Sequence, residues 1–598
     1  MKKASCALFI VFVLAALAYG QAPQPNSYAL SMFHFNIQYV VGGLEGFVPL
    51  PFPVPSWEIT AEEVEDMIIT ESFEPVLDLY LAHPQWGFTI EFQGLLLEVL
   101  RDRHPTVLEK LRTLIENGQA DAVSFHYSDQ LFLAFPRQDW DMTYAFNKEI
   151  FEDANIPLST VVFSQEGQAG TGMAAAMAAQ GYKTLVWPKN LAEYQWGDFD
   201  AKPYYKFAED LNLIMGAKGV NDPDSGFAVT WTFFDDGERL ASKDWDPYFP
   251  WFFKKNQEAI DEYVAELTSL ENDGWKISKV SDYIADLKSA SVPKAELQPL
   301  LEGTWQPDST DGAFRWLGGI GLWAKDERDN HERTLCAMAR REVLAAETAA
   351  NAAGIDAQPE IKEAWRMILQ AEVTDATGIN PYIGEIHYGI THAAEAIRMA
   401  REVIERAKIA KGISQALIDT KAGTMVSTAG PEPPGNKIEP VLLLALSCPL
   451  RTCSDVWSVV NDDPLIYKID FQFSPASNFL GRQISVTFPG QEGPIVFCPA
   501  LTDDAPASYN REDFIFEHFY LGLGNGMIGL GGGYFIVLDQ SKTHVAAMIK
   551  PTTPDVSMSD DTAPWSEEIN WTIYLISGSV DQATDLADRV NVHPALYR

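Results

Sequence analysis

The pattern of hydrophobic and polar positions changes character twice along the chain. From about residue 27 to 300, short β-rich runs such as STVVF and TLVW alternate with helical stretches such as HPTVLEKLRTLIENG. This alternation is typical of a parallel sheet whose faces are covered by helices. The length of the region favours a (β/α)7-type barrel over an open doubly wound sheet. The first prediction is therefore an α/β fold that begins with a barrel.

Two further segments are expected after the barrel. Between about 310 and 412, apolar residues recur at three- and four-residue spacing, which predicts a helical bundle. The stretch TAGPEPPGNKIEP is typical of a linker, because proline and glycine exclude regular structure. Beyond it, LIYKIDFQF and RQISVTF alternate apolar and polar residues, as strands of a β-sandwich do. The predicted domains are a barrel over 21–300, a helical bundle over 301–425 and a β-sandwich over 426–598.

The first residues, MKKASCALFIVFVLAALAYGQ, combine two lysines, a short apolar core and small residues near a cleavage position. They predict a signal peptide over 1–20 and a secreted or periplasmic protein. No other stretch is long and apolar enough to cross a bilayer, so we expect no membrane insertion.

The net charge and the cysteine spacing narrow the binding partners and the kinds of site that the protein is expected to have. The formal net charge is -39, which disfavours binding to nucleic acid and to anionic lipid. The spacing of Cys336, Cys448, Cys453 and Cys498 matches no zinc motif. In an exported chain a disulfide among the last three is expected, with Cys448–Cys453 as the first choice. Cys336 lies in an alanine-rich helical run and is expected to be a free thiol in the core.

The candidate chemistry lies where the predicted strands end. Ligands of parallel α/β folds bind at the carboxyl ends of the strands. Those ends carry His34, Asn36, His126, Asp129, Glu166, Trp187, Asp235 and Asp236. Each residue alone has a structural explanation, and for the two histidines that explanation is equally good. Their coincidence at one edge predicts a site, and two facing carboxylates suit glycoside cleavage, in which one protonates the leaving oxygen and the other attacks the sugar.

A glycine-rich segment, GTWQPDSTDGAFRWLGGIGLW, adds Trp305 and Trp316. Two interpretations stay open. The segment is either a packed loop between domains or a substrate-binding wall on which sugar rings stack.

Five motifs occur in a familiar order along about residues 30 to 400. They are MFHFNIQY, LIENGQADAVSFHYSD, VVFSQEGQ, TFFDDGERL and AWRMILQAEVTDATG. In this order they resemble the barrel of glycoside hydrolase family 57, which is related to the family 38 α-mannosidases. Phe163 and Gln165 stand where the family has Trp and Pro, so the resemblance is at the level of the superfamily and the sugar specificity does not carry over.

The resemblance implies a secreted glycosidase that cleaves or transfers α-linked glycans by a retaining mechanism, without a cofactor. It places the nucleophile on Glu166 and the acid/base on Asp235, with Asp236 one position away as the alternative. It also implies that Asp375 enters the site from the helical region. The remaining strand-end residues, together with Trp305 and Trp316, are expected to bind an oligo- or polysaccharide substrate.

Two other functions stay open. A polysaccharide deacetylase would use an Asp-Asp pair and an HxxxH metal motif; Asp235-Asp236 supplies the pair, but the sequence contains no HxxxH. A non-catalytic surface or carbohydrate-binding protein on a degenerate barrel would also fit the loose motifs and the strong acidity.

The sequence predicts activity without a metal ion. The stretch HFN lacks the Asp of the zinc site that family 38 would need, and paired carboxylates can do the acid and nucleophile work alone. We expect hydrolysis of a glycoside substrate to continue at an unchanged rate after dialysis against EDTA. Loss of activity on chelation that zinc restores would contradict this.

Overall fold

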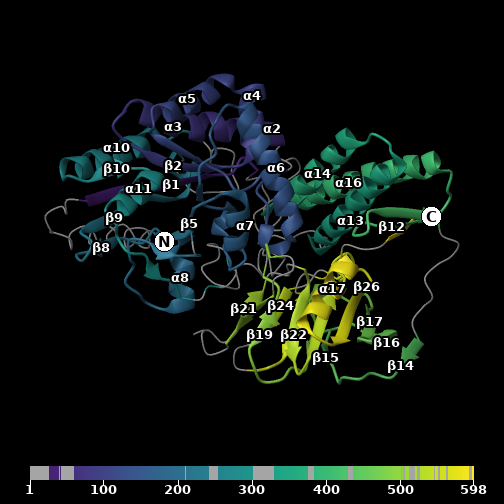
Figure 1. The fold of residues 1–598 in the computed structure, drawn as a ribbon. Helices are drawn as coiled ribbons and strands as arrows, with labels where there is room; N and C mark the ends of the chain where they lie inside the picture. The colour runs from purple at the N-terminus through teal and green to yellow at the C-terminus, as the bar shows by residue number, and fades with distance from the viewer. Residues whose placement is uncertain are drawn as a thin grey trace.

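The computed structural model describes residues 26–38, 41, 59–208, 210–241, 254–298, 300, 303, 329–374, 383–427, 436–499, 501–502, 506–510, 519–521, 525–543, 546–549, 553–560, 563, 565–591 and 595–597. The expected signal peptide, Trp305, Trp316 and Asp375 lie outside these residues. An α/β region comes first, a helical segment follows it, and antiparallel sheets end the chain (Figure 1). This order agrees with the changes in hydrophobic pattern.

The first sheet is built around β1 (Asn26–Phe35), which pairs in parallel with three other strands. These partners are β2 (Phe88–Phe92), β9 (Phe227–Asp236) and β10 (Lys276–Ser278), with β3 (Ala120–Val123) beyond β2 and the antiparallel β8 (Val220–Asp222) beyond β9. Nine of the ten residues of β1 are buried, as expected of a central strand that is covered on both faces.

The second sheet contains the parallel strands β4 (Val161–Val162), β5 (Thr184–Pro188) and β7 (Asn212–Gly216), extended by β6 (Tyr205–Lys206) and β11 (Ala295–Glu296). β3 and β4 are in contact, but no ladder joins them in the described part of the chain. The mixed α/β organisation is thus confirmed as two sheets, and the predicted closure into one barrel is not.

Amphipathic helices cover the two sheets, and α5 (Pro105–Glu116) shows why they form. Its buried Val107, Leu108, Leu111 and Leu114 share one face at helical spacing. Proline at its first position fits the helix start, and Gly118, with φ of 74°, ends it in the left-handed region. The other principal helices here are α2 (Ala61–Ile68), α3 (Glu74–Leu81), α4 (Gly94–Arg103), α6 (Arg137–Asp153), α7 (Met173–Gln180), α8 (Lys189–Trp196), α10 (Gln257–Asn272) and α11 (Val280–Ser289).

The predicted helical segment is confirmed as α13 (Asp329–Ala353), α14 (Gln358–Ala371) and α16 (Ile383–Lys411), which pack against one another. A buried cation joins this segment to the α/β region. Arg340 Nε of α13 lies 2.6 and 2.7 Å from the two carboxylate oxygens of Asp139 on α6. Its Nη2 lies 3.4 Å from Oε1 of Glu372, just after α14. Burial and the charge of Asp139 raise the pKa of Glu372, so Arg340 supplies the positive charge that this cluster needs.

The C-terminal part forms two antiparallel sheets that share one apolar core. In the larger sheet, β17 (Leu465–Phe473) alternates buried residues such as Ile469 and Phe471 with half-buried or exposed ones over most of its length. The strands of the two sheets are β14 (Asn436–Ile438), β15 (Ala445–Ser447), β16 (Cys453–Asp462), β18 (Ile484–Phe488), β19 (Ile495–Phe497), β20 (Ala507–Tyr509), β21 (Phe519–Leu521), β22 (Met527–Gly531), β23 (Tyr534–Leu538), β24 (Ala546–Ile549), β25 (Val556–Asp560) and β26 (Ile569–Ser577).

Two further elements were not expected from the sequence. A helix, α17 (Val580–Asn591), packs on β22 and β23. A small sheet joins β12 (Ala416–Asp419), β13 (Thr424–Ser427) and β27 (Ala595–Tyr597), so the end of the chain returns to the segment after α16.

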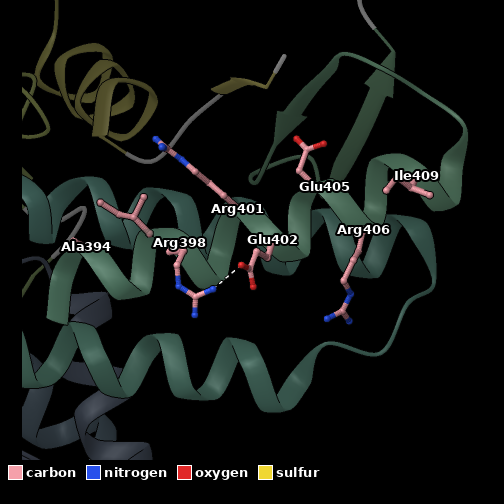
Figure 2. A pocket seen from close by; sticks show the side chains of 8 residues that line it. Ala394, Arg398, Arg401, Glu402, Glu405, Arg406 and Ile409 are labelled. Carbon is pink, nitrogen blue, oxygen red and sulfur yellow. Dashed lines mark hydrogen bonds and ion pairs between the residues drawn. The ribbon is translucent and has the colours of Figure 1, made fainter. Parts of the chain in front are cut away.

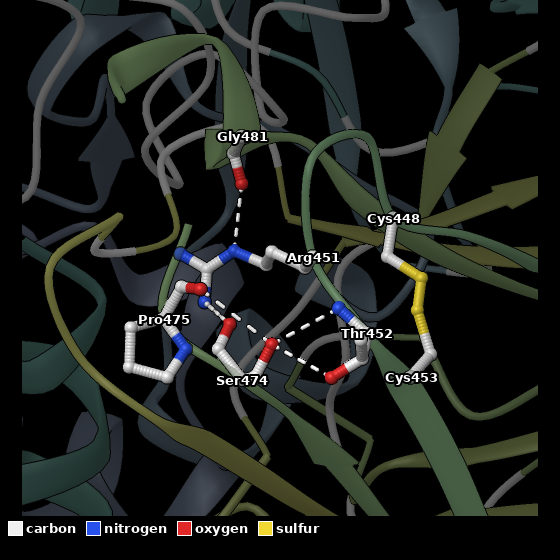
Figure 3. The surroundings of a disulfide bond; sticks show 7 residues. All are labelled: Cys448, Arg451, Thr452, Cys453, Ser474, Pro475 and Gly481. Atoms are coloured by element: carbon white, nitrogen blue, oxygen red, sulfur yellow. Dashed lines mark hydrogen bonds between the residues drawn. A yellow bond between two sulfur atoms is a disulfide. The ribbon is translucent and has the colours of Figure 1, made fainter. Parts of the chain in front are cut away.

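The expected disulfide between Cys448 and Cys453 is confirmed (Figure 3). It closes a short loop that carries Arg451. The guanidinium of Arg451 donates to three backbone carbonyl oxygens, those of Gly481 at 2.7 Å, Ser474 at 3.0 Å and Glu567 at 3.1 Å. The disulfide loop therefore ties distant parts of the C-terminal sheets together.

The cysteine expected in the core is also confirmed as a buried free thiol. Cys336 donates to Oε1 of Glu332, one helical turn earlier, at 3.0 Å. Among the described residues, no helix is both long and apolar enough to cross a membrane.

The C-terminal sheets contact the α/β region beside the segment that follows Glu166. Tyr509 of β20 donates a hydrogen bond to Oγ1 of Thr171, and Leu501 packs into the apolar core around β5 and β7. Nη1 of Arg137 donates to the carbonyl oxygen of Leu501 at 3.2 Å. The C-terminal part is therefore packed against the region that carries the candidate site.

The buried ion cluster generates a stability prediction. Arg340→Ala leaves Asp139 and Glu372 buried without their cation, so we expect the free energy of unfolding to fall by about 3–5 kcal/mol. Arg406→Ala removes an exposed pair with Glu360 and should cost no more than about 1 kcal/mol. Urea unfolding followed by circular dichroism measures both, and equal losses in the two variants would contradict the prediction.

Candidate active site

The site begins with the register of β1. His34 pairs with Glu91 on β2 and with Asp236 on β9. Residues in register on neighbouring strands point to the same face of a sheet, so these three side chains form one row. His34 Nδ1 forms a hydrogen bond with Oε2 of Glu91, and all three residues are buried.

The row contains one positive charge. Burial alone would lower the pKa of His34, but the negative charges of Glu91, Asp236 and Asp129 outweigh it and raise the pKa to about 10. His34 is therefore an imidazolium at neutral pH. Burial raises the pKa of Glu91, and the charge of His34 opposes that rise.

Two carboxyl groups beside His34 have pKa values close to neutral. Burial raises the pKa of Asp236 to about 6, with Asp235 adding to the rise and His34 opposing it. Burial and the charge of Asp236 raise the pKa of Glu238 to about 8. Glu238 Oε1 accepts a hydrogen bond from the backbone N–H of Asn36 at 2.8 Å. Carboxyl groups that retain a proton near neutral pH are suited to general acid catalysis.

A bulge in β9 decides which aspartate faces His34. Leu30 pairs with Trp231 but the next residue, Ser31, pairs with Phe233, so Thr232 is the extra residue. This one-residue shift brings Asp236, and not Asp235, opposite His34. Asp235 pairs with Phe33, so its side chain points to the opposite face of the sheet from His34. It is 38% exposed and forms an ion pair with Arg239. The placement favours Asp236 over the predicted Asp235 as the buried acid.

The second predicted carboxylate, Glu166, lies on a short turn after β4. Its φ of 53° and ψ of 26° are in the left-handed region, which a non-glycine residue adopts only under constraint. Gln165 N donates to Nε2 of His126 at 2.7 Å, and Gln165 Nε2 donates to Oγ1 of Thr374 at 3.2 Å. The side chain of Glu166 is buried.

Phe163 links this turn to the row of charges. Its ring lies 5.9 Å from that of His34 and 5.2 Å from that of Phe234, measured between centroids. The positive charge of His34 also lowers the pKa of His126, an effect second to burial. The turn of Glu166 and the end of β9 therefore border one and the same region.

Amide side chains connect the other predicted residues. Asn36 Oδ1 accepts from the backbone N–H of Gln38 at 2.7 Å and from Nε2 of Gln93 at 3.1 Å. Gln93 Nε2 also donates to Asp129, and the backbone N–H of Asp129 donates to Oε1 of Gln38 at 3.0 Å. The structure thus brings Asn36 and Asp129 together with His34, as the strand-end pattern predicts.

Four of the predicted aromatic and acidic residues remain, of which one lies in the core and three lie outside the described residues. Trp187 belongs to β5, and its side chain is fully buried in the apolar core that packs against this strand. Its ring centroid lies 5.0 Å from that of Trp196. Trp305 and Trp316 lie outside the described residues, as does Asp375. The residue before Asp375 reaches the site, because Thr374 N donates to the carbonyl oxygen of Asp129 at 2.7 Å.

Glu91 and Gln93 belong to the cluster but were missed in the sequence, whereas Glu238 stands at a predicted strand end and was given no role. The run FTIEFQ carries the first two, and its mid-strand carboxylate within an apolar run was the available signal. Glu238 follows Asp236 by two residues and was outweighed by the aspartate pair.

A separate surface hollow lies in the described part of the chain. This shallow hollow along α16 is lined by alternating charges, including the ion pair of Arg398 with Glu402 (Figure 2). It contains none of the predicted site residues. In the part of the chain that the structure describes, no group of three or more His, Cys, Asp or Glu side chains could hold a metal ion.

Comparison with known proteins finds distant similarity to two curated enzymes and to solved structures. No family model matches the chain. It is 26% identical over 142 residues to α-amylase 1 of Dictyoglomus thermophilum, covering 24% of this chain and 18% of that protein. It is 22% identical over 241 residues to the 4-α-glucanotransferase of Thermococcus litoralis, covering 36% of this chain and 35% of that protein. The match thus spans well under half the length of either relative.

The fold is shared more widely than the sequence. The crystal structure of an α-mannosidase from Enterococcus faecalis V583 superimposes with a TM-score of 0.59 at 10% identity, covering 95% of this chain and 89% of that chain. The chain resembles glycoside hydrolases of families 57 and 38. The resemblance inferred from the five motifs is therefore confirmed.

The raised pKa of Glu238 generates a pH prediction. A carboxyl whose pKa rises from 4.5 to about 8 on folding stabilises the fold below pH 4.5, and this stability is lost as the pH rises through 8. Glu238→Gln removes the ionisation. The free energy of unfolding of the variant, measured relative to that of the wild type, should therefore be higher at pH 9 than at pH 5 by at least about 1.4 kcal/mol, the equivalent of one pKa unit.

Urea unfolding at the two pH values measures this difference. Glu439→Gln, which changes an exposed carboxylate on the C-terminal sheets, serves as the matched control and should show no such difference. A Glu238→Gln variant that follows the wild-type pH dependence would contradict the assignment of a buried, protonated Glu238.

Proposed function

We propose that the protein is a secreted glycoside hydrolase or glycosyl-transferring enzyme that acts on α-linked glycans through Glu166 and Asp236. The observation that carries this proposal is the bulge in β9, which places the buried Asp236 opposite the imidazolium of His34. The distant similarity to an α-amylase and a 4-α-glucanotransferase supports the α-linked substrate class.

The proposed mechanism is retaining. Glu166 attacks the anomeric carbon while Asp236 gives its proton to the leaving oxygen, and a covalent glycosyl intermediate forms. Asp236, now ionised, then takes a proton from water or from an acceptor sugar hydroxyl, whose oxygen displaces Glu166. The raised pKa of Asp236 supports its role as the acid, because the group must hold a proton until it donates. This mechanism requires the two carboxyl groups to lie about 5–5.5 Å apart.

The surrounding residues have supporting roles in this proposal. His34, which forms a hydrogen bond with Glu91, supplies a positive charge that offsets the negative charge of the buried carboxyl groups around it. Asn36, Asp129 and Asp375 are proposed to bind the substrate, as are Trp305 and Trp316. The buried position of Trp187 supports a role in the core.

The proposal also covers the closure of the barrel and the domain boundaries. We propose that the two parallel sheets are the halves of one (β/α)7-type barrel over 21–300, followed by the helical domain over 301–425 and the β-sandwich over 426–598. The contact between β3 and β4 supports this closure. Secretion after removal of residues 1–20 completes the proposal.

Activity of the purified protein on aryl α-glycosides and α-glucan oligosaccharides tests the function. Asp236→Asn should lower kcat by about 10²–10⁴-fold, the usual contribution of a general acid, and Glu166→Gln should lower it at least as much. Asp235→Asn is the matched control and should change kcat by no more than about twofold, as exposed substitutions do. Proton NMR of the first product should show the same anomer as the substrate.

Three outcomes would overturn parts of this proposal. Binding of glycans without turnover would identify a carbohydrate-binding protein, and release of acetate from acetylated glycans would identify a deacetylase. A large loss in Asp235→Asn with an active Asp236→Asn would exchange the two roles.

A further inference from the structure

The turn that carries Glu166 is unusual in its backbone. Glu166 and Gly167 are consecutive residues in the left-handed region, each with φ of 53°. Glycine adopts this conformation without steric cost, but glutamate does not. A strained residue of this kind persists only where the surrounding structure holds it in place.

Hydrogen bonds fix the turn on both sides of Glu166. Gln168 Nε2 donates to the carbonyl oxygen of Gln165 at 3.0 Å and to that of Gln130 at 2.8 Å. The hydroxyl of Ser164 donates to the carbonyl oxygen of Gln168. On the strand side, the backbone N–H of Gln165 donates to Nε2 of His126 at 2.7 Å. His126 is thus bonded to the residue immediately before Glu166.

The imidazole of His126 is committed to this one bond. It is fully buried, and its ring packs against Phe125 and Phe132 at centroid distances of 5.4 and 5.5 Å. Because Nε2 accepts a hydrogen bond from a backbone N–H, the ring proton lies on Nδ1. Nδ1 has no hydrogen-bond partner among the described residues. A buried donor without a partner costs free energy. The ring of His126 therefore keeps its hydrogen bond to Gln165 through Nε2 while its Nδ1–H is without a partner among the described residues.

We propose that His126 is a positioning residue for Glu166, which acts by holding the backbone N–H of Gln165 and so aiming the carboxylate. This replaces the expectation that His126 binds substrate, and it rests on the proposed function of Glu166. The imidazole must stay neutral to accept this bond, and burial together with the positive charge of His34 lowers its pKa.

Two variants of His126 distinguish the effect of its hydrogen-bond acceptor from the effect of its aromatic ring on packing. His126→Phe keeps an aromatic ring but cannot accept, whereas His126→Gln places an amide oxygen near the position of Nε2. We expect His126→Phe to lower kcat on an aryl α-glycoside by about 10–100-fold with little change in KM, because small misplacements of a reacting group have effects of that size. His126→Gln should recover most of the loss.

A second readout does not depend on activity. Hydrogen exchange of the peptide over residues 164–170, measured by mass spectrometry, should be faster in His126→Phe and close to wild type in His126→Gln. Thr543→Val is the matched control, because it removes a buried acceptor in the C-terminal sheets, for the backbone N–H of Thr572 at 2.7 Å, away from the turn. It should leave both kcat and the exchange of this peptide unchanged.

The outcomes are distinguishable. Wild-type kcat and exchange in a folded His126→Phe would overturn the proposal, as would a raised KM with unchanged kcat, which indicates contact with substrate. If His126→Phe does not fold by circular dichroism, His126→Asn, whose amide is too short to reach Gln165, takes its place. If the wild-type enzyme shows no turnover, the proposed function fails, and the exchange measurement still decides whether His126 holds the turn.

Discussion

One buried positive charge holds the candidate site together. Glu91 and Asp236 flank His34 in the interior of the first sheet, and Asp129 and Glu238 lie near them. Buried carboxylates repel one another and lose their hydration, so such a cluster is compatible with folding only if a cation or retained protons balance it. The imidazolium supplies the cation, and the raised pKa values of Asp236 and Glu238 supply the protons. The same balance leaves carboxyl groups that keep their protons to a higher pH than exposed ones do.

A second constraint acts on the opposite side of the site. The strained turn of Glu166 is held by bonds from two parts of the chain, and a third part bonds the residues beyond it. His126 and Gln130 belong to the α/β region, Thr374 follows the helices, and Tyr509 of the C-terminal sheets contacts Thr171 beyond the turn. The helical segment is in turn fastened by the buried Arg340. The geometry of the turn therefore depends on the α/β region and on the residue that follows α14, and the C-terminal sheets contact the chain just beyond it.

The pattern of apolar residues predicted the order of the three regions, because a helix face or a strand face is set by neighbours within a few positions. The Cys448–Cys453 disulfide was predictable for the same reason, since the two cysteines are only five positions apart in the sequence. The strand-end rule found His34, Asn36, Asp129 and Glu166 because the ends of parallel strands meet at one edge. It also selected Trp187, which packs into the core, because the rule says nothing about which face a residue occupies.

The sequence by itself determined the order of the α/β, helical and β-rich regions, many of the residues at the strand ends, and which family the motifs resemble. Only the tertiary structure decided which of Asp235 and Asp236 lies opposite His34. Alternate residues of a strand point to opposite faces, so the extra residue Thr232 in β9 exchanges the faces to which the two adjacent aspartates point. The left-handed turn at Glu166 and the cationic state of His34 were likewise decided by contacts with residues distant in the chain. Register and burial are properties of the assembled sheet, and no local pattern of residues contains them.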